Sequence, residues 1–469
     1  LARPTPHGAA TGAPTNGDPP VRSTHVPPPV TTEPAVLVAH DPAEVAVRTA
    51  AVLERAAAHT EHFAEFYRDL HRNPELSYQE VRTAAKLAES LTASGLEVHT
   101  GIGGTGVLGI LRNGPGPTVL LRGDMDGLPV IEDTGLPYAS TAVGTTFDGV
   151  ETGVMHACGH DMHTTGIAAT AHALSQSTEL WSGTLMVVGQ PAEEALGGAT
   201  AMLDAGMYTQ FGTPDVVLGQ HVSGQPAGVM VHGAGQIMAA CASVDVTIIG
   251  LGGHGSTPEN CIDPILIAAH LITRLQSVVA RETPRNGFLV MTVGRAHSGT
   301  KSNIIPDEAL LQISVRAPST EVLEWAINRI RQVAAAEALA SNAPEPPRVE
   351  VTMMARAVSN DAPTSDAVSL SHRAVFGDAQ VWRQQGVIMA SEDFGVFNGF
   401  DGGYTAHLIP THFWFIGSNP ADSWGADPTE LTPSPTTLPT AHASGFAPEL
   451  ASTLPAARAA MVAAALTYL

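Results

Sequence analysis

Four short apolar runs along the chain end abruptly in acidic or imidazole side chains. They are "TVLLRGDMDGLPV" at 118–130, "TLMVVGQPAEE" at 184–194, "DVVLGQHV" at 215–222 and "GVIMASEDFG" at 386–395. Continuous runs of this kind predict strands that are buried on both faces of a sheet. Helix-like stretches at 163–176 and 197–206 separate the first three runs, which predicts βα alternation and a largely parallel sheet. Ligand sites in such sheets lie beyond the carboxyl ends of the strands, so the polar endings should converge on one place.

The remaining patterns divide the chain into regions. Apolar residues recur at three and four positions through 41–75, which predicts one amphipathic helix capped by Asp41. Residues 1–40 are rich in Pro, Thr, Ala and Gly without an apolar period, and we expect a disordered tail. Residues 239–355 combine alternating strands with amphipathic helices, as an α+β domain would. We therefore expect this domain to be inserted into an α/β catalytic domain made of 41–238 and 356–469.

Length, charge and cysteine content narrow the class of protein. The 469 residues suit at least two domains, and a net charge of −22 makes nucleic acids and anionic membranes poor partners. No run approaches the roughly 20 apolar residues of a membrane helix. The three cysteines, Cys158, Cys241 and Cys261, are an odd number and a poor basis for disulfides, which favours a reducing, cytoplasmic location. The chain starts at Leu1, which is also compatible with a removed leader.

The stretch "MHACGHDMHT" at 155–164 carries the first candidate chemistry. Cys158 and His160 are two positions apart and can point to one side of an extended or turning chain, which suits metal ligands. Alone, this pair is typical of a buried free cysteine beside a helix-capping histidine. A nucleophilic cysteine activated by His160 or His163 is a second alternative. Carboxylates at the same place would raise a thiol pKa, whereas a divalent cation would deprotonate the thiol, so we favour the metal.

Glu193, Glu194 and His221 follow predicted strands and should join this cluster. Side chains on neighbouring positions diverge, so one glutamate can bind a metal while the other reaches a water that the metal activates. A solvated acidic turn is the simpler alternative. Asp124 and Asp126 in "GDMDG" share one side of the chain, and one of them can orient a ligand histidine or form only a turn.

Eight motifs now appear in one order: "LRGDMDGLPV", "MHACGHDMHT", "GQPAEE", "GQHV", "GGHGSTPE", "SNIIPDE", "SEDFG" and "AHASGF". Over about residues 45–469 the chain resembles the M20 metallopeptidase clan, and most of all its aminoacylase-like branch of N-acyl-amino-acid, hippurate and auxin-conjugate amidohydrolases. The resemblance implies a zinc-peptidase-like catalytic domain with an inserted lid and dimerisation domain. Cys158 points to this branch, because the peptidase branches use an aspartate bridge at that place.

The resemblance also implies roles for single residues. The implied metal ligands are Cys158, His160, Glu194, His221 and His442. Glu193 resembles the general base, Asp126 the carboxylate behind a ligand histidine, and His254 the lid histidine that steadies the oxyanion, often across a dimer. Asn303 and Arg316 resemble lid residues that contact the substrate. His442 lacks the proline usual in its motif, which leaves His407 and His412 as alternatives, and His163 is expected to be a nearby helix residue.

The expected activity is hydrolysis of N-acyl amino acids or similar small amides with two divalent ions. Thiolate and imidazole ligands favour zinc, while the carboxylates keep manganese, cobalt and nickel open. A dipeptidase or carboxypeptidase of the same clan and a catalytically silent small-molecule-binding relative are the alternatives. A homodimer or homotetramer through the inserted domain is expected.

Overall fold

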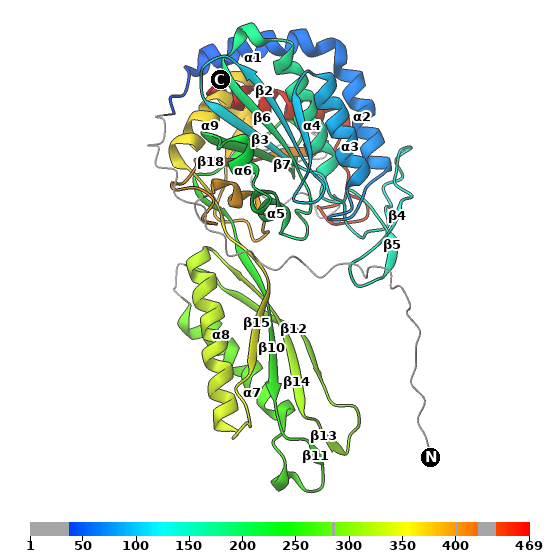
Figure 1. Cartoon of the computed structure of the whole chain (residues 1–469), viewed down its shortest axis with the longest axis vertical. Coiled ribbons are helices and arrows are strands. Elements are labelled where there is room, and N and C mark those ends of the chain that lie inside the picture. Colours follow the sequence, from blue (N-terminus) through cyan, green and yellow to red (C-terminus); the bar gives the residue numbers. More distant parts are fainter. Residues whose placement is uncertain (1–36, 284–286, 400–401, 421–437) are drawn as a thin grey trace, which may run out of the picture.

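The computed structural model describes residues 37–283, 287–399, 402–420 and 438–469. Two regions are evident in Figure 1: a large sheet covered by helices, and an elongated four-stranded sheet with two helices on one face. Most of the expected tail at 1–40 lies outside the described residues.

The large sheet has eight strands, and its centre is parallel, as predicted. Its spatial order is β1 (Glu97–Ile102), β2 (Gly106–Asn113), β6 (Gly183–Gln190), β3 (Thr118–Asp124), β7 (Val216–Pro226), β18 (Thr411–Asn419), β8 (Met230–His232) and β17 (Val381–Arg383). The four strands β6, β3, β7 and β18 run parallel to one another, while β1, β2 and β8 pair antiparallel with their inner neighbours. The carboxyl ends of the central strands therefore meet at one edge.

One of the four predicted strands is wrong. Residues 386–393 form a loop with a single bridge from Ile388 to Met238, a 3₁₀ helix, Phe394–Asn398, follows, and the fourth parallel strand is β18 instead. A glycine with φ of 76° at Gly386 turns the chain at the start of this run. Glu392 and Asp393 in this run are buried because they pair with Arg122 of β3. They do not end a strand. A short apolar run cannot distinguish these cases.

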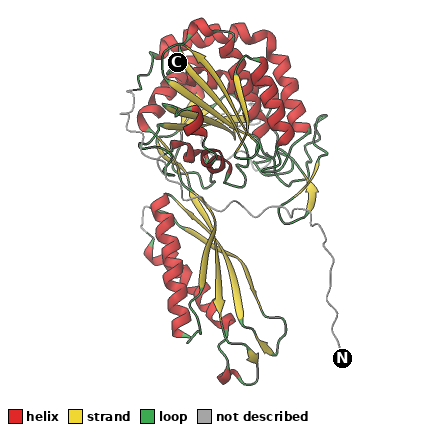
Figure 2. Ribbon diagram, in the orientation of Figure 1, coloured by secondary structure: helices red, strands yellow, loops and turns green. Residues whose placement is uncertain are grey.

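Helices cover both faces of the large sheet (Figure 2). One face of the sheet packs on six of the described helices. The core between them contains apolar side chains from alternate positions of β3, β6 and β7. The helices of this group are α1 (Pro42–Ala56), α2 (Thr60–Arg72), α3 (Val81–Ala93), α4 (His160–Ser175), α9 (Ala362–Phe376) and α10 (Leu450–Leu466). The other face packs on α5 (Gly198–Asp204) and α6 (Met207–Phe211). Burial on both faces explains why these strands read as continuous apolar runs.

The predicted long helix at 41–75 is two helices. Asp41 caps α1, because its side chain accepts a hydrogen bond from the Ala43 N–H at 2.8 Å and Pro42 occupies the first turn. A single 3₁₀ turn, Ala57–His59, separates α1 from α2. The apolar period continues through this turn, so the periodicity alone did not reveal the break.

The elongated region contains β10 (Ala240–Ile249), β12 (Val290–Ser298), β14 (Glu308–Ala317) and β15 (Arg348–Ala355), in the antiparallel order β12-β14-β10-β15. The helices α7 (Pro264–Ser277) and α8 (Thr320–Ala340) pack on one face and share a separate apolar core with it. The pair β11 (Gly253–His254) and β13 (Ile304–Ile305) lies at the far tip (Figure 1). None of the described helices is long and apolar enough to cross a membrane.

Two further small pairs complete the described strands. The first is β9 (Gly235–Met238) with β16 (Val358–Asn360), beside the junction of the two regions. The second is β4 (Val143–Thr145) with β5 (Glu151–Gly153), a hairpin that projects from the large region (Figure 1).

Three buried histidines join β8, β18 and α9 on the face of the sheet that α9 covers. His372 donates from Nε2 to the Ala460 carbonyl at 2.9 Å, so its Nδ1 accepts from His232 Nε2 at 3.0 Å. His232 Nδ1 then accepts from His412 Nε2 at 2.9 Å. The chain of bonds requires His372 and His232 to be neutral, whereas His412 Nδ1 has no hydrogen-bond partner. Burial lowers the pKa of His412 to about 3 and that of His372 to about 4, and it holds the pKa of His232 well below its usual value.

These histidines predict a loss of stability in acid. The unfolded chain protonates them near pH 6.5 and the folded chain does not, so their stabilisation is present above that pH and is lost as the pH falls toward the folded pKa values. The His412→Gln variant keeps an amide donor for His232. It removes one histidine that is protonated only in the unfolded chain. Between about pH 6.5 and about 4.5 its free energy of unfolding should fall less steeply than that of the wild type, by up to about 1.4 kcal/mol per pH unit. Urea unfolding over a pH series measures both slopes, and parallel curves would refute the assignment.

Candidate metal centre and active site

The predicted polar endings converge at the carboxyl edge of the central strands. Asp124 is the last residue of β3, Glu193 and Glu194 follow β6, and His221 lies in β7. His160 is the first residue of α4. Gly159 precedes it with φ of 79°, and a Cβ there would come within 2.4 Å of the Val222 side chain. Glycine thus permits the close approach that brings the start of α4 to β7.

Within the described residues, four groups of side chains offer ligand atoms that lie within 4.8 Å of one another. The groups are Asp124, His160, His163 and His221; Cys158, Glu194 and His442; His160, Glu193 and Glu194; and Asp124, Glu193 and Glu392. The groups share members, so they form one continuous cluster. All five metal ligands implied by the sequence belong to it.

His160 presents a free ring nitrogen to the cluster, and His221 directs a ring nitrogen to the Cys158 sulfur. His160 donates from Nδ1 to Asp126 Oδ1 at 3.2 Å, and its buried Nε2 has no hydrogen-bond partner. His221 donates from Nδ1 to the Val222 carbonyl at 2.6 Å, which leaves the Nε2 lone pair 3.5 Å from Cys158 Sγ. A carboxylate or carbonyl behind a histidine in this way fixes the ring tautomer that a metal needs.

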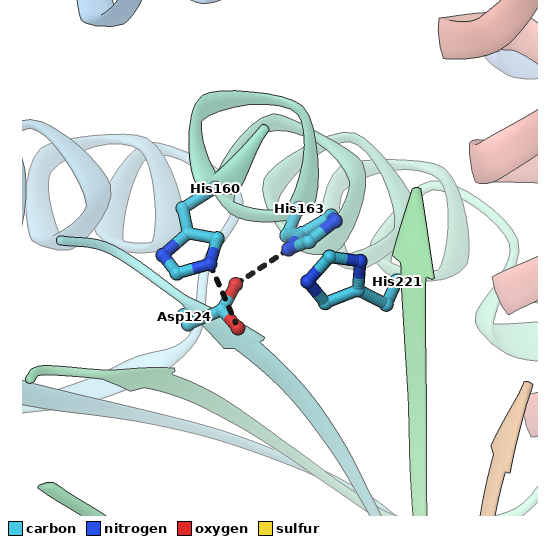
Figure 3. Close-up of side chains that lie close together, drawn as sticks. All are labelled: Asp124, His160, His163 and His221. Atoms are coloured by element: carbon cyan, nitrogen blue, oxygen red, sulfur yellow. Dashed lines mark hydrogen bonds and ion pairs between the residues drawn. The ribbon is translucent and has the colours of Figure 1, made fainter. Parts of the chain in front are cut away.

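His163 lies beside these rings but has no free nitrogen (Figure 3). Its Nδ1 donates to Asp124 Oδ1 at 2.5 Å, and its Nε2 accepts from the Val222 N–H at 2.8 Å. Burial lowers the pKa of this imidazole to about 3, so the ring is neutral. His163 therefore links β3, α4 and β7, and its lone pair is used within the protein.

Cys158 is a buried, free cysteine whose sulfur faces imidazoles. Burial raises its pKa, but the nearby His221, His160 and His442 more than offset burial and hold the pKa of the thiol well below its usual value. A thiolate in reach of three imidazoles and a carboxylate is a metal-ligand environment. The electrostatics agree with the ligand alternative for Cys158.

The adjacent glutamates have different surroundings. Burial, Glu392 and Glu194 raise the pKa of the Glu193 carboxyl well above its usual value. Burial and the Cys158 sulfur raise the pKa of Glu194 to about 7, although His442 lies 3.4 Å from Glu194 Oε1. That oxygen has no hydrogen-bond partner. Both carboxylates lie 3.8 Å from His160 Nε2, but Glu194 also faces Cys158 and His442, whereas Glu193 groups with Asp124 and Glu392.

Asp126 holds the glutamate turn and a histidine together. Its Oδ1 accepts from the Glu193 N–H at 3.1 Å as well as from His160, and its Oδ2 accepts from the Glu194 N–H at 3.0 Å and the Ser77 hydroxyl at 2.7 Å. These bonds, mainly the one with His160, keep the pKa of Asp126 below its usual value despite burial. It orients the groups around it and contacts no solvent.

A buried arginine behind the site was not singled out by the sequence. Arg122 donates to Asp124 Oδ2 at 2.7 Å, to Glu392 Oε1 at 2.6 Å and to Gln190 Oε1 at 2.7 Å. Gln190 in turn donates to Asp393 Oδ1 at 2.6 Å. The signal was present in the sequence, because an arginine inside the apolar run "TVLLRGD" must find acidic partners when that strand is buried.

The three residues predicted to contact the substrate occupy two places. His254 is exposed in β11, where its Nδ1 accepts from the Ser256 hydroxyl at 2.7 Å, and Asn303 is exposed at the same tip. Neither belongs to the cluster in the single chain. Arg316 lies nearer, since it donates to the Met389 carbonyl at 2.7 Å and the Ser391 hydroxyl at 3.1 Å, one residue before Glu392.

Of the three candidates for the last ligand, the structure brings His442 to the cluster. Its ring lies beside Cys158 and Glu194, which raise its pKa to about 10. It has φ of 71°, and its N–H donates to the Ala157 carbonyl at 2.8 Å, which ties this segment to the cysteine loop. His412 belongs to the buried histidine chain, and His407 is in none of the metal-binding groups formed by the described residues.

These residues fit a divalent metal. The cluster offers a thiolate, three imidazoles and carboxylates, which are ligand types of zinc and its neighbours. Buried polar atoms without partners are rare in proteins, yet His160 Nε2 and Glu194 Oε1 are both buried and unpartnered here. A bound cation would satisfy both. The fold and this centre define a metal-dependent hydrolase.

Comparison with known proteins agrees with this class. The family model for peptidase family M20/M25/M40 matches residues 120–430. Hippurate hydrolase of Campylobacter jejuni is 37% identical over 339 residues, which are 71% of this chain and 84% of that protein. Thermostable carboxypeptidase 2 of Saccharolobus solfataricus is 40% identical over 271 residues, 57% of this chain and 66% of that protein.

A solved structure is similar over most of its length. The Bacillus subtilis YXEP protein, described as a dinuclear metal binding peptidase from the M20 family, has a TM-score of 0.68 and 27% identity, covering 87% of this chain and 98% of its own. The chain belongs to peptidase family M20/M25/M40, within its aminoacylase-like group of metal-dependent amidohydrolases.

Proposed function

We propose that this protein hydrolyses the amide bond of N-acyl amino acids or similar small amides. The observation that carries the proposal is the buried Glu193 next to a cluster with two unpartnered ligand atoms, His160 Nε2 and Glu194 Oε1. The likeness to a hippurate hydrolase supports the same substrate class. A cytoplasmic location fits the three free cysteines.

Cys158, His160, Glu194, His221 and His442 would hold two divalent ions, with zinc the first expectation from the thiolate and imidazoles. Such ions supply Lewis acidity toward the attacking water and the amide carbonyl. The protein fixes their ligands from behind: Asp126 orients His160, and the Val222 carbonyl orients His221.

Glu193 moves the proton. Its raised pKa makes the carboxylate basic enough to take a proton from water as the water oxygen bonds to the carbonyl carbon. The C–N bond then breaks while the Glu193 carboxyl delivers that proton to the leaving nitrogen. The products are the carboxylic acid and the free amino acid.

The inserted domain would bind the other end of the substrate. Arg316 donates to Met389 and Ser391, close to Glu392, and its guanidinium suits the substrate carboxylate. His254 and Asn303 lie at the tip of the domain, so within this proposal they act on the site of a second copy, with His254 donating to the oxyanion. A homodimer through the inserted domain follows from this proposal.

A carboxypeptidase is the competing function, favoured by the relative from Saccharolobus solfataricus. Both functions cleave an amide next to a carboxylate, and they differ in the group on the other side of the amide. Purified protein should hydrolyse acyl-amino acids in preference to peptides, should lose activity with a chelator, and should contain about two divalent ions per chain, in line with a dinuclear site. A substrate panel with metal analysis of the same preparation tests this. Peptides cleaved faster than every acyl-amino acid would favour the competitor.

A further inference from the structure

The β4–β5 hairpin carries exposed apolar side chains. Phe147 at its tip is 76% exposed, and Val143, Val150 and the adjacent Ile131 are all more than half exposed. Single exposed apolar residues are ordinary, but a group of large ones on a short segment indicates a binding surface. The hairpin segment 143–153 contains Asp148 and Glu151 and no Lys, Arg or His. Its chemistry therefore suits an uncharged apolar group and not a carboxylate.

Tyr78 connects this surface to the turn that carries the catalytic glutamates. A Cβ at Gly197 would lie 2.5 Å from the Tyr78 hydroxyl oxygen, so the phenol packs directly on the backbone there. Gly197 closes the turn, since its N–H donates to the Ala192 carbonyl at 3.4 Å. Burial, together with the charges of nearby carboxylates that include Asp126, raises the pKa of Tyr78 to about 12. The ring thus stands at the rim of the site.

Glu80 fixes Tyr78 relative to the catalytic turn. One oxygen of Glu80, Oε1, accepts from the Tyr78 N–H and from the Ala192 N–H, both at 2.8 Å. Tyr78 has φ of 62° and Ala192 has φ of 49°, a conformation that residues other than glycine rarely adopt. Such outliers persist only where surrounding bonds hold them and gather at functional sites. Glu80 and the backbone therefore hold the Tyr78 ring in a fixed position relative to the turn.

Phe147 extends the aromatic surface outward. Its ring meets that of Tyr78 edge to face, with centroids 6.3 Å apart. The hairpin itself is anchored, because Gln79 donates from Nε2 to the Thr145 carbonyl at 3.0 Å. Tyr78 is 38% exposed, so the pair forms an aromatic surface with one end at the glutamate turn and the other in solvent.

We propose that Tyr78 and Phe147 form the acyl subsite and determine specificity for aromatic acyl groups. The inference rests on the proposed function. It adds that the acyl group is the part of the substrate that contacts the hairpin. With the carboxylate end at Arg316, the opposite end of an N-acyl amino acid requires an apolar surface, and this pair supplies one at the turn that carries Glu193. An aromatic acyl group gains ring contacts there that an acetyl group cannot make.

The test compares kcat/KM for N-benzoyl-glycine and N-acetyl-glycine. Wild type should prefer the benzoyl substrate, and Phe147→Ala should lower the benzoyl-to-acetyl ratio roughly tenfold, mainly through KM, as the loss of an aromatic contact predicts. Phe147→Tyr keeps the ring and should restore the ratio. Leu339→Ala removes an equally exposed apolar residue at the end of α8 and should leave the ratio unchanged.

The outcomes separate the subsite from the function. If wild type cleaves both substrates and Phe147→Ala keeps the wild-type ratio, the subsite is refuted while the amidohydrolase stands. If wild type cleaves neither, the proposed function fails and the subsite with it. If Phe147→Ala lowers both rates equally and shifts the oligomeric state in size-exclusion chromatography, the apolar hairpin is a protein interface and the proposal is overturned.

Discussion

The Glu193→Gln variant is expected to keep its metal content and to lose activity by roughly 10³-fold in kcat, as removal of a general base does. Glutamine has the size of Glu193 and retains the N–H that donates to Asp126. It cannot take a proton from water or deliver one to the leaving nitrogen. Metal analysis and steady-state kinetics on the same preparation measure the two effects. Full activity in the variant would eliminate Glu193 as the base.

Glu194→Gln is the matched control, because the two residues are neighbours in one buried turn. Glu194 Oε1 lies among Cys158, His442 and His160, so its replacement should lower metal content, and activity should fall with it. The pair of variants separates proton transfer from metal binding. If both variants lost metal to the same degree, the assignment of Glu193 as base and Glu194 as metal ligand would be wrong.

The sequence predicted the fold class well because burial on both faces leaves a strong signal. Three continuous apolar runs became β3, β6 and β7, with helices between them. The run at 386–395 had the same composition and became a loop, since its acidic residues pair with Arg122 inside the protein. The 3₁₀ turn at 57–59 was equally hidden, because it leaves the apolar period unchanged. Composition thus shows that a segment is buried. Which partner buries it depends on the tertiary structure.

At the site, spacing predicted neighbours and the structure supplied orientations. The C-x-H pair and the glutamate pair suggested a metal site, and the five implied ligands stand together. The sequence could not assign tautomers, which follow from the Val222 carbonyl behind His221 and from Asp126 behind His160. Nor could it reveal that both ring nitrogens of His163 are hydrogen-bonded within the protein. The roles of His254 and Asn303 stay predictions, because the single chain holds them at the tip of the elongated region.

Arg122 is expected to be essential for stability as well as for the geometry of the site. It is fully buried and lies against Asp124 and Glu392, with Asp393 at 3.5 Å. Arg122→Met would leave these carboxylates buried without their cation, and loss of one partner from a buried ion pair costs about 3–5 kcal/mol. Metal content should fall too, because Asp124 belongs to the ligand cluster and Gln190, which Arg122 also holds, precedes the glutamate turn.

Urea unfolding of Arg122→Met, with Arg112→Met as the matched control, measures this effect. Arg112 pairs with Glu97 at the surface, where both side chains are about half exposed, and such pairs contribute about 0–1 kcal/mol. If Arg122→Met does not fold, Arg122→Lys supplies the measurement: it keeps the charge but not the planar fork that reaches Gln190, Asp124 and Glu392 at once, so an intermediate loss is expected. Equal unfolding midpoints for the variants at 112 and 122 would show that the buried carboxylates are neutralised without the arginine. In that case protonation of Asp393, whose pKa burial and Glu392 raise well above its usual value, would be the alternative source of charge balance.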